Sequence, residues 1–329
     1  MPDVSMSIAG SPAPPKVTLR ELRVRGVHVP LKRPLATSSG TVGIAPLTLI
    51  DLLTHEGVIG RTYLFCYTPL VLKPVLELLR NLSAMLAGQP VVPLELDRRL
   101  QRTFRLLGNS GVTGMAAAGI DMAAWDALAR AAGLPLVRLL GGEPRRVPAY
   151  NSNGLGIIGA ARAAAEAEEL IAPGFGAVKV RLGYDDAAAD VAVVRAVRRA
   201  IGERVQMMSD YNQALSAPEA IRRGHALDGE GLYWIEEPTR ADDYEGNARI
   251  ARALKTAVQI GENFGSASDM ANAIAAGACD YAMPDATKIG GVTAWMRCAA
   301  LAEAHGVPMS THLFPEVSAH MMTATPTAH

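Results

Sequence analysis

Short apolar segments recur at nearly even spacing through the second half of the chain. Seven such segments, spaced 23 to 29 residues apart, end at Ser152, Arg181, Asp210, Glu236, Glu262, Asp285 and His312. Alanine-rich stretches that favour helices separate them. Strands and helices alternating in this way are typical of β–α units whose strands run parallel in one sheet. The spacing predicts a (β/α) barrel, TIM-like and modified, whose last strand lies after residue 329 and is missing from the given chain.

The segment before the barrel has a different pattern. Two strand-like runs between Leu19 and Leu53 flank the loop TSSGTVG (37–43), which predicts a β-hairpin or meander. Helical patterns follow at 71–87, 93–107 and 114–132. We therefore expect an α+β domain in front of the barrel.

These patterns predict that the chain is divided into three parts. Residues 1–16 contain Pro12, Pro14 and Pro15 among small polar residues, and a segment of this composition buries little apolar surface. We expect a flexible tail at 1–16, an α+β capping domain at 17–145 and the barrel at 146–329.

Composition limits the partners of the chain. Lys and Arg (32) balance Asp and Glu (32), so no strong field attracts nucleic acid or an anionic membrane, and we expect neither as a partner. The chain has no basic, apolar leader and no run of 18 apolar residues, which favours a cytoplasmic protein. Cys66, Cys279 and Cys298 show no metal-ligand spacing and are expected to be reduced thiols.

Three acidic residues close successive predicted strands. Asp210 ends VQMMSD, Glu236 ends GLYWIE and Glu262 ends TAVQIGE. The carboxyl ends of barrel strands meet at one mouth, so three carboxylates there need a cation. Oxygen-only ligands suit Mg²⁺ better than zinc. A single acid at a strand end more often caps a helix, but three in succession favour the metal site, while strand alternation turns Glu237 the other way as a structural partner.

The next two strands end in an acid and a histidine. A carboxylate beside an imidazole orients the ring and raises its basicity, so Asp285 and His312 are candidates for a general base. On the second strand Lys179 and Arg181 share one face and point inward, either toward barrel carboxylates or toward a substrate anion. Further candidates for orienting or hydrogen-bonding roles in substrate binding are Ser152, Asn212 and Lys288.

Several motifs together resemble the enolase superfamily, in its mandelate racemase and muconate lactonizing enzyme group. They are AAAGIDMAAWDALAR (116–130), DYN (210–212), IEEP (235–238), PDATKIGG (284–291) and THLFPEVSAH (311–320). The resemblance covers the chain from about residue 17 to its end. It implies a capping domain over a barrel and a homo-oligomer, by analogy an octamer.

The resemblance also implies roles for individual residues. The acids Asp210, Glu236 and Glu262 would bind Mg²⁺, Lys179 would neutralise a substrate carboxylate, and His312 with Asp285 would be the base on one face. Loop 37–43 would be a mobile flap. An apolar pocket, which favours an aromatic or apolar 2-hydroxy acid, would be built from Leu35, Val42, Phe65 and Tyr67.

The sequence departs from the racemase pattern at Arg181, which replaces the second lysine of a KxK motif. Racemisation needs a base on each face. Neutralising the side chain at pH 7 costs about 4.6 kcal/mol for lysine and about 9 kcal/mol for arginine. Our first interpretation is Mg²⁺-dependent removal of the α proton of a 2-hydroxy carboxylate through an enediolate, leading to racemisation of an apolar or aromatic 2-hydroxy acid. The alternatives are an acid-sugar dehydratase in which Arg181 is only electrostatic, and a non-catalytic protein that binds Mg²⁺ and ligand.

Overall fold

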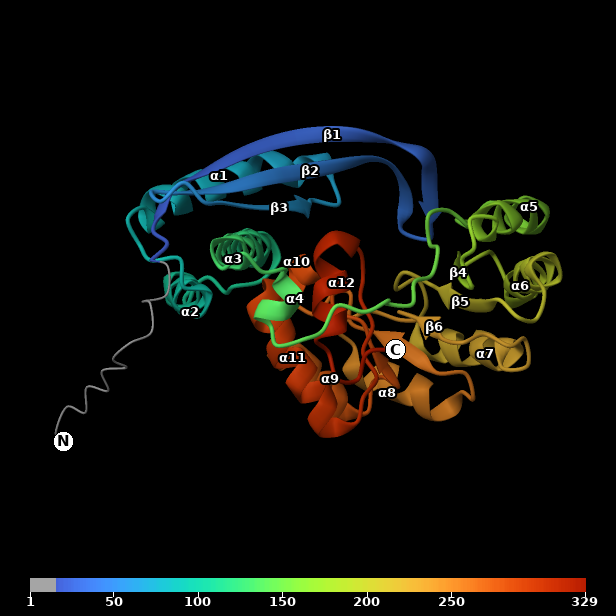
Figure 1. Ribbon diagram of the computed structural model, residues 1–329. Helices are drawn as coiled ribbons and strands as arrows, with labels where there is room; N and C mark the ends of the chain where they lie inside the picture. Colours follow the sequence, from blue (N-terminus) through green and yellow to red (C-terminus); the bar gives the residue numbers. More distant parts are fainter. Residues whose placement is uncertain (1–15) are drawn as a thin grey trace.

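The structure, a computed structural model, describes residues 16–329. An α+β layer lies over a parallel α/β layer, and the long hairpin of the first bridges the second (Figure 1). The predicted flexible tail, apart from Lys16, lies outside the described residues. In the described part of the chain, no helix is both long and apolar enough to cross a membrane.

The first layer is an antiparallel sheet covered by helices, in agreement with the predicted capping domain. Its strands follow the order β1 (Leu19–Thr37), β2 (Gly40–Thr54) and β3 (Ile59–Phe65). The helices are α1 (Pro69–Leu86), α2 (Pro93–Thr103), α3 (Gly111–Ala131) and the short α4 (Leu136–Leu139).

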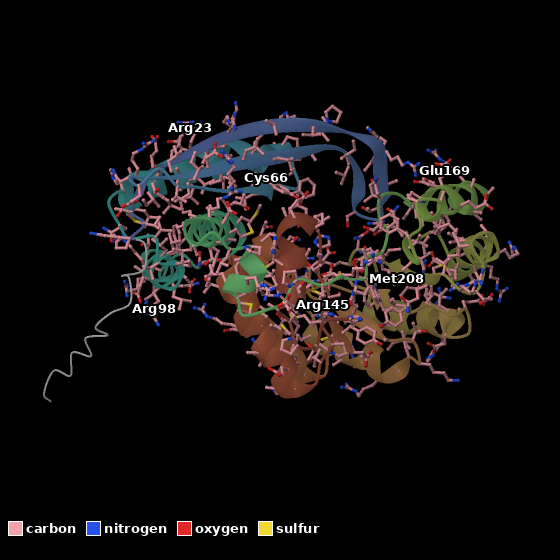
Figure 2. The ribbon with its side chains drawn as sticks, in the orientation of Figure 1. Arg23, Cys66, Arg98, Arg145, Glu169 and Met208 are labelled. Carbon is pink, nitrogen blue, oxygen red and sulfur yellow. The ribbon has the colours of Figure 1, made fainter. Side chains whose placement is uncertain are left out.

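Helix α3 lies close against the sheet because its residues are small. A Cβ on Gly119 would lie 2.6 Å from a methyl group of Ile50, and a Cβ on Gly60 would lie 2.0 Å from the Ala123 carbonyl oxygen. Alanine and glycine therefore allow the helix to be buried on most of its surface. Cys66 lies in this core as a free thiol (Figure 2).

The hairpin β1–β2 extends well beyond the rest of the cap sheet. Its far end bends down toward β4 and α5 (Figure 1). At the tip, Ser38 Oγ donates to the Tyr211 carbonyl oxygen at 2.7 Å and Ser39 Oγ donates to that of Asn212 at 3.1 Å. The hairpin is thus anchored on the loop that follows a barrel strand.

The second layer is the predicted parallel barrel. Its sheet runs in the order β4 (Ala177–Arg181), β5 (Gln206–Asp210), β6 (Ile235–Glu236), β7 (Val258–Ile260) and β8 (Tyr281–Ala282). Single parallel bridges extend it from Val178 to Asn151 on one side, and from Ala282 to Met309 and on to Ala328 on the other. Ala328 forms only an isolated bridge, so the strand count is compatible with the predicted barrel whose last strand is missing from the given chain.

Helices connect the strands. They are α5 (Ala160–Ile171), α6 (Ala187–Ile201), α7 (Ala217–Leu227), α8 (Tyr244–Ala253), α9 (Ala267–Ala276), α10 (Ala286–Ile289), α11 (Gly291–His305) and α12 (Pro315–Thr323). Several begin at a side chain that accepts a hydrogen bond from a backbone N–H of the first turn; these are Asp186, Ser216, Asp243 and Ser266.

The two layers are joined by polar contacts between α3 and the start of α11. Asp121 Oδ2 accepts a hydrogen bond from the Thr293 N–H at 2.9 Å, and the Thr293 hydroxyl donates to the other oxygen. Trp125 Nε1 donates to Thr293 Oγ1 at 2.9 Å. Gly291, with φ +79°, permits this approach, because a Cβ there would lie 2.4 Å from Asp121 Oδ2. The helix motif at 116–130 and the PDATKIGG motif at 284–291 therefore contact each other.

Candidate functional site

A cavity of about 950 Å³ lies at the carboxyl ends of the barrel strands, beneath the cap hairpin. Both layers contribute to its lining. It includes the substrate-pocket candidates from the sequence, namely Leu35, Val42, Phe65, Tyr67, Ser152, Asn212 and Lys288. A large concave site that gathers polar groups at barrel strand ends is the expected location of a ligand site.

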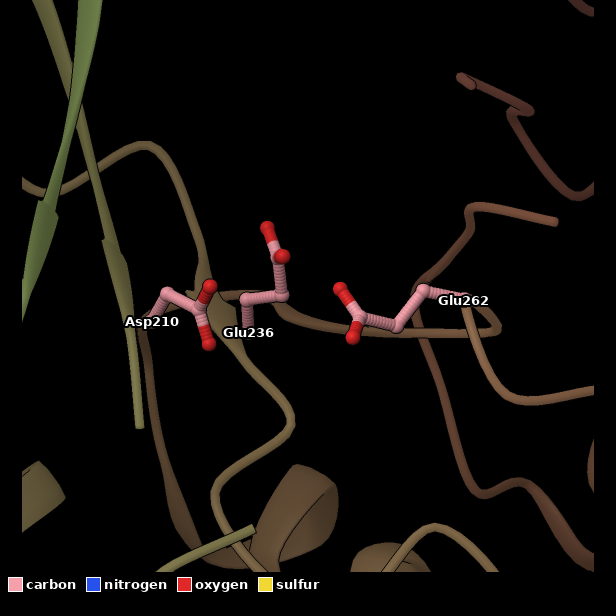
Figure 3. Close-up of side chains that lie close together, drawn as sticks. All are labelled: Asp210, Glu236 and Glu262. Carbon is pink, nitrogen blue, oxygen red and sulfur yellow. The ribbon is translucent and has the colours of Figure 1, made fainter. Parts of the chain in front are cut away.

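Three carboxylates converge at the base of this region. Asp210 ends β5, Glu236 ends β6 and Glu262 follows β7 by two residues. One oxygen from each lies within 4.8 Å of the others, and Figure 3 shows the three side chains directed toward one another. All three are buried. The structure thus brings together the three acids that the sequence proposed as metal ligands.

The charges around the three carboxylates fit a divalent cation. Lys179 Nζ lies 3.1 Å from Asp210 Oδ2 and forms a still closer ion pair with Glu236. Burial raises the pKa of Glu236 well above its ordinary value although Lys179 opposes this change. Full ionisation of the three acids therefore needs more positive charge than Lys179 supplies. Because every candidate ligand atom is a carboxylate oxygen, Mg²⁺ fits the site.

Asn212 orients one of these carboxylates. Its backbone N–H donates to Asp210 Oδ1 at 2.8 Å, and its side-chain amide donates to Oδ2 at 3.1 Å. Burial opposes ionisation of Asp210, but the positive charges of Lys179 and Arg181 outweigh it and lower the pKa. Asp210 is thus held as an anion in a fixed orientation.

Asp285 and His312 form the pair predicted from the sequence. His312 Nδ1 lies 2.7 Å from Asp285 Oδ2, and Nε2 lies 3.3 Å from Glu262 Oε2. Burial opposes ionisation of Asp285, yet the hydrogen bond from His312 lowers its pKa. The ionised Asp285 accepts a hydrogen bond from the Nδ1–H group, which leaves Nε2 beside Glu262.

Tyr67 contacts Asp285 of this pair, a role that the sequence did not predict. Its hydroxyl donates to Asp285 Oδ2 at 2.8 Å, and its ring centroid lies 4.1 Å from Lys288 Nζ. Burial raises the pKa of Tyr67 well above its ordinary value, so the hydroxyl keeps its proton. The cap therefore supplies a polar group as well as an apolar wall.

Arg181 is engaged with the backbone. Its Nη1 donates to the carbonyl oxygens of Ser152 at 2.9 Å and Gly154 at 2.8 Å, and its Nε lies 4.0 Å from Asp210 Oδ2. These acceptors fix the guanidinium beside the loop after the first barrel segment. Ser152 thus contributes its backbone oxygen to this contact.

The orientation of the Glu237 side chain differs from the prediction. Strand alternation predicted that it faces away from the site, but β6 ends at Glu236 and Glu237 has φ +37°, so the alternation stops there. Its side chain lines the cavity, where Asn263 Nδ2 lies 2.9 Å from both carboxylate oxygens. Asn263 Oδ1 in turn accepts from Lys288 Nζ at 2.7 Å. Asn263 was missed, and its position directly after Glu262 is the signal that could have found it.

The wall of the cavity is largely apolar. Leu35 and Val42 face each other across the hairpin, and the rings of Phe65 and Tyr67 lie 4.6 Å apart between centroids. Further apolar residues that the sequence did not single out are Leu31, Leu47, Leu313, Phe314 and Met322.

Both halves of the chain match known families. Residues 19–141 match the family described as mandelate racemase / muconate lactonizing enzyme, N-terminal domain, and residues 162–329 match the one described as enolase C-terminal domain-like.

Solved structures and a curated protein are also similar. An enolase from the alpha proteobacterium BAL199 with bound magnesium is 48% identical, with a TM-score of 0.93, over 95% of this chain and 87% of that one. An enolase from Bradyrhizobium complexed with magnesium and mandelic acid is 41% identical, with a TM-score of 0.92, over 96% and 87%. The L-talarate/galactarate dehydratase of Salmonella typhimurium is 36% identical over 222 residues, which are 67% of this chain but only 56% of the dehydratase.

Proposed function

Because the chain belongs to the mandelate racemase / muconate lactonizing enzyme family of the enolase superfamily, we propose that it is a Mg²⁺-dependent enzyme that removes the α proton of a small 2-hydroxy carboxylate. The observation that carries this proposal is the position of His312. Its Nδ1 is held by Asp285 while its Nε2 lies beside Glu262, which supports a base next to the candidate metal site.

Different residues of the chain have different roles in the proposed reaction. Asp210, Glu236 and Glu262 would hold Mg²⁺, which supplies positive charge for the carboxylate of the substrate as its α carbon loses a proton. Lys179 adds a second positive charge at the Asp210 side. His312 Nε2 would accept the α proton because Asp285 fixes the tautomer and stabilises the imidazolium.

The position of Arg181 favours one base over two. Its guanidinium donates to backbone oxygens and its Nε lies 4.0 Å from Asp210 Oδ2, so the side chain is committed to contacts within the protein. The racemisation predicted first from the sequence needs a proton acceptor at that position. We therefore favour one-base chemistry with His312, in which Arg181 is electrostatic. The homo-oligomer stays a prediction from the family.

Deuterium exchange tests the proposal. In D₂O with Mg²⁺, we expect the α proton of mandelate to exchange, as followed by proton NMR, and His312→Asn to abolish exchange while mandelate still protects the protein from thermal unfolding. His225→Asn is the matched control, because His225 is an exposed histidine on α7. Exchange that survives in His312→Asn contradicts the role of His312. Binding without exchange by the wild-type chain, across a panel of 2-hydroxy acids, supports the non-catalytic alternative.

A further inference from the structure

We infer that Asp190 and Arg223 are positioning residues for the candidate metal site: through Tyr211 they hold the loop after β5, which carries Asn212 and receives the hairpin tip. Neither Asp190 nor Arg223 lines the cavity. They lie on α6 and α7, which are neighbours beside β4 and β5 (Figure 1). The inference rests on the proposed function, because it assigns residues that support the same site.

The first observation is a buried ion pair between the two helices. Arg223 Nη1 lies 2.8 Å from Asp190 Oδ2, and the two side chains are 8% and 0% exposed. Asp190 Oδ1 accepts from the backbone N–H groups of Gly183 and Tyr184, both at 3.0 Å. Oδ2 also accepts from the Tyr211 hydroxyl at 2.9 Å. The desolvation of two buried charges offsets most of their attraction, so the pair is a weak source of stability. It does fix the orientation of the groups bound to it.

The loop after β4 is held from both sides by this ion pair. Asp190 binds two of its N–H groups, and Arg223 donates to the carbonyl oxygens of Tyr184 at 2.7 Å and Asp185 at 3.2 Å. The Tyr184 hydroxyl in turn accepts from the backbone N–H groups of residues 158–159, at 3.0 and 2.9 Å. The ion pair therefore ties the loop after β4 to the segment just before α5.

The loop after β5 has a backbone form that needs support. Asn212 has φ +46° and Gln213 has φ +67°, a left-handed conformation that residues with a Cβ disfavour. In this form the N–H and the side-chain amide of Asn212 both reach the Asp210 carboxylate. Tyr211, which lies between these two residues in the chain, is 1% exposed and extends its hydroxyl to Asp190. Its side chain therefore anchors the loop from the helix side of the sheet.

The same two loops form the surface on which the hairpin tip rests. Ser38 Oγ donates to the Tyr211 carbonyl oxygen at 2.7 Å. Gly183, whose N–H is bound by Asp190, has φ +111°, and a Cβ there would lie 3.2 Å from the Ser38 Cβ. A change in the ion pair should therefore reach the hairpin tip through two neighbouring loops, and should reach Asp210 through one of them.

The proposed base lies apart from this arrangement. Within residues 16–329, no hydrogen bond joins Asp285 or His312 to Asp190, Arg223 or Tyr211. Loss of the ion pair should therefore weaken the capture of Mg²⁺ and of substrate, and leave proton transfer nearly unchanged once both are bound. In kinetic terms, KM should rise while kcat stays constant.

Tyr211→Phe tests this expectation, because it deletes the hydroxyl bound to Asp190 and keeps the buried ring. We expect the Kd of Mg²⁺, measured by calorimetry with MgCl₂ alone, to rise about 10-fold. KM for α-proton exchange of mandelate should also rise, with kcat within about 2-fold of the wild type. Ile201→Val removes one buried methyl group from α6, controls for lost stability, and should change none of these constants. An unchanged Kd in Tyr211→Phe, or equal effects of the two variants, overturns the inference.

Two neighbouring arginines on α7 test the ion pair itself. Arg223→Lys keeps a positive charge beside Asp190 but lacks the planar fork that reaches the carbonyl oxygens of the loop after β4. We expect a higher Kd for Mg²⁺ and faster cutting of the hairpin tip in limited proteolysis. Arg222→Lys, exposed and paired with Glu219, is the matched control and should change neither. Wild-type values in Arg223→Lys overturn the assignment of Arg223.

These measurements distinguish a failure of the inference from a failure of the proposed function. Mg²⁺ binding and proteolysis need no turnover, so they decide the role of Asp190 and Arg223 whatever the exchange rate. A wild type that binds Mg²⁺ but exchanges no α proton in any 2-hydroxy acid defeats the proposed function alone. Exchange by the wild type, together with an equal Mg²⁺ affinity in Tyr211→Phe, defeats the inference alone. Absence of Mg²⁺ binding in the wild type defeats both.

Discussion

Asp285 is the residue that connects the base to the rest of the site. Its Oδ1 accepts hydrogen bonds from the backbone N–H and the hydroxyl of Thr287, at 2.7 and 2.6 Å. Its Oδ2 is shared by His312 and Tyr67. With both oxygens occupied, the carboxylate cannot rotate without losing several donors. The orientation of the imidazole thus depends on groups from the cap as well as from the barrel.

Removal of the Tyr67 hydroxyl should therefore slow catalysis. We expect Tyr67→Phe to lower kcat for α-proton exchange about 2- to 10-fold with little change in KM, because it deletes one hydrogen bond to Asp285 and keeps the aromatic wall. Steady-state exchange rates measured by NMR give the two constants. Tyr63→Phe is the control, because the Tyr63 hydroxyl bonds to Glu316 instead. Equal effects of the two variants would contradict a specific role for Tyr67.

The metal site predicts a stability change that does not depend on activity. Mg²⁺ at about 100 times its Kd should stabilise the protein by about 2.7 kcal/mol, and the melting temperature should rise accordingly. Glu262→Gln should reduce this shift strongly, since it removes one of three anionic ligands. Glu230→Gln, which alters a surface ion pair with Arg195, should keep it. A shift of equal size in both variants would place the cation elsewhere.

The candidate residues that the structure brings together share one property. Asp210, Glu236 and His312 close apolar strands, and the barrel geometry alone brings such positions together. Glu237 was placed wrongly because its positive φ breaks the alternation on which the prediction relied. The polar role of Tyr67 could not be predicted, because it depends on how the cap is seated on the barrel, and no local pattern encodes that contact.

Among the elements, the hairpin tip differs from the loop that its local sequence predicted. The Ser- and Gly-rich segment 37–43 indicated a loop, yet β1 continues to Thr37 and β2 begins at Gly40. The pairs Leu35–Val42 and Thr37–Gly40 extend the ladder to the tip. Contacts with the barrel hold the tip in this form, and such contacts override weak strand propensity.

Loosening the hairpin tip should weaken substrate capture. We expect Ser38→Ala combined with Ser39→Ala to raise KM about 3- to 10-fold, because both hydrogen bonds to the loop after β5 are lost. Limited proteolysis should also cut the tip faster. Thr41→Ala, an exposed substitution on the same hairpin, is the control. An unchanged KM would show that the hairpin closes without these two bonds.

At the scale of the whole molecule, the sequence predicted a cap and a barrel but not how they are joined. The family matches cover 19–141 and 162–329, while the boundary at 145/146 stays a prediction. The helix motif at 116–130 and the PDATKIGG motif supported the family resemblance, which the family matches confirm. In the structure the two motifs meet at Asp121, which lies at the N-terminus of α11. A carboxylate there is favoured by the helix dipole but opposed by burial.

The balance between these two effects predicts a pH dependence of stability. Burial raises the pKa of Asp121 to about 7, although the hydrogen bonds from Thr293 oppose the rise. A carboxyl whose pKa is higher in the folded than in the unfolded state binds more protons when folded, so its contribution to stability is present below about pH 4 and is lost as the pH rises to about 7. Asp121→Asn cannot ionise and imitates the protonated acid.

Urea denaturation of both proteins measures this difference. Relative to Asp121→Asn, the wild type should lose up to about 4 kcal/mol of unfolding free energy between pH 4 and pH 7.5, which is the energy of a shift of about three pKa units. Asp121→Ala should be destabilised at both pH values, because it leaves the buried Thr293 N–H without its acceptor. Parallel pH profiles for the wild type and Asp121→Asn would mean that Asp121 stays ionised, and that the helix dipole and Thr293 together outweigh its burial.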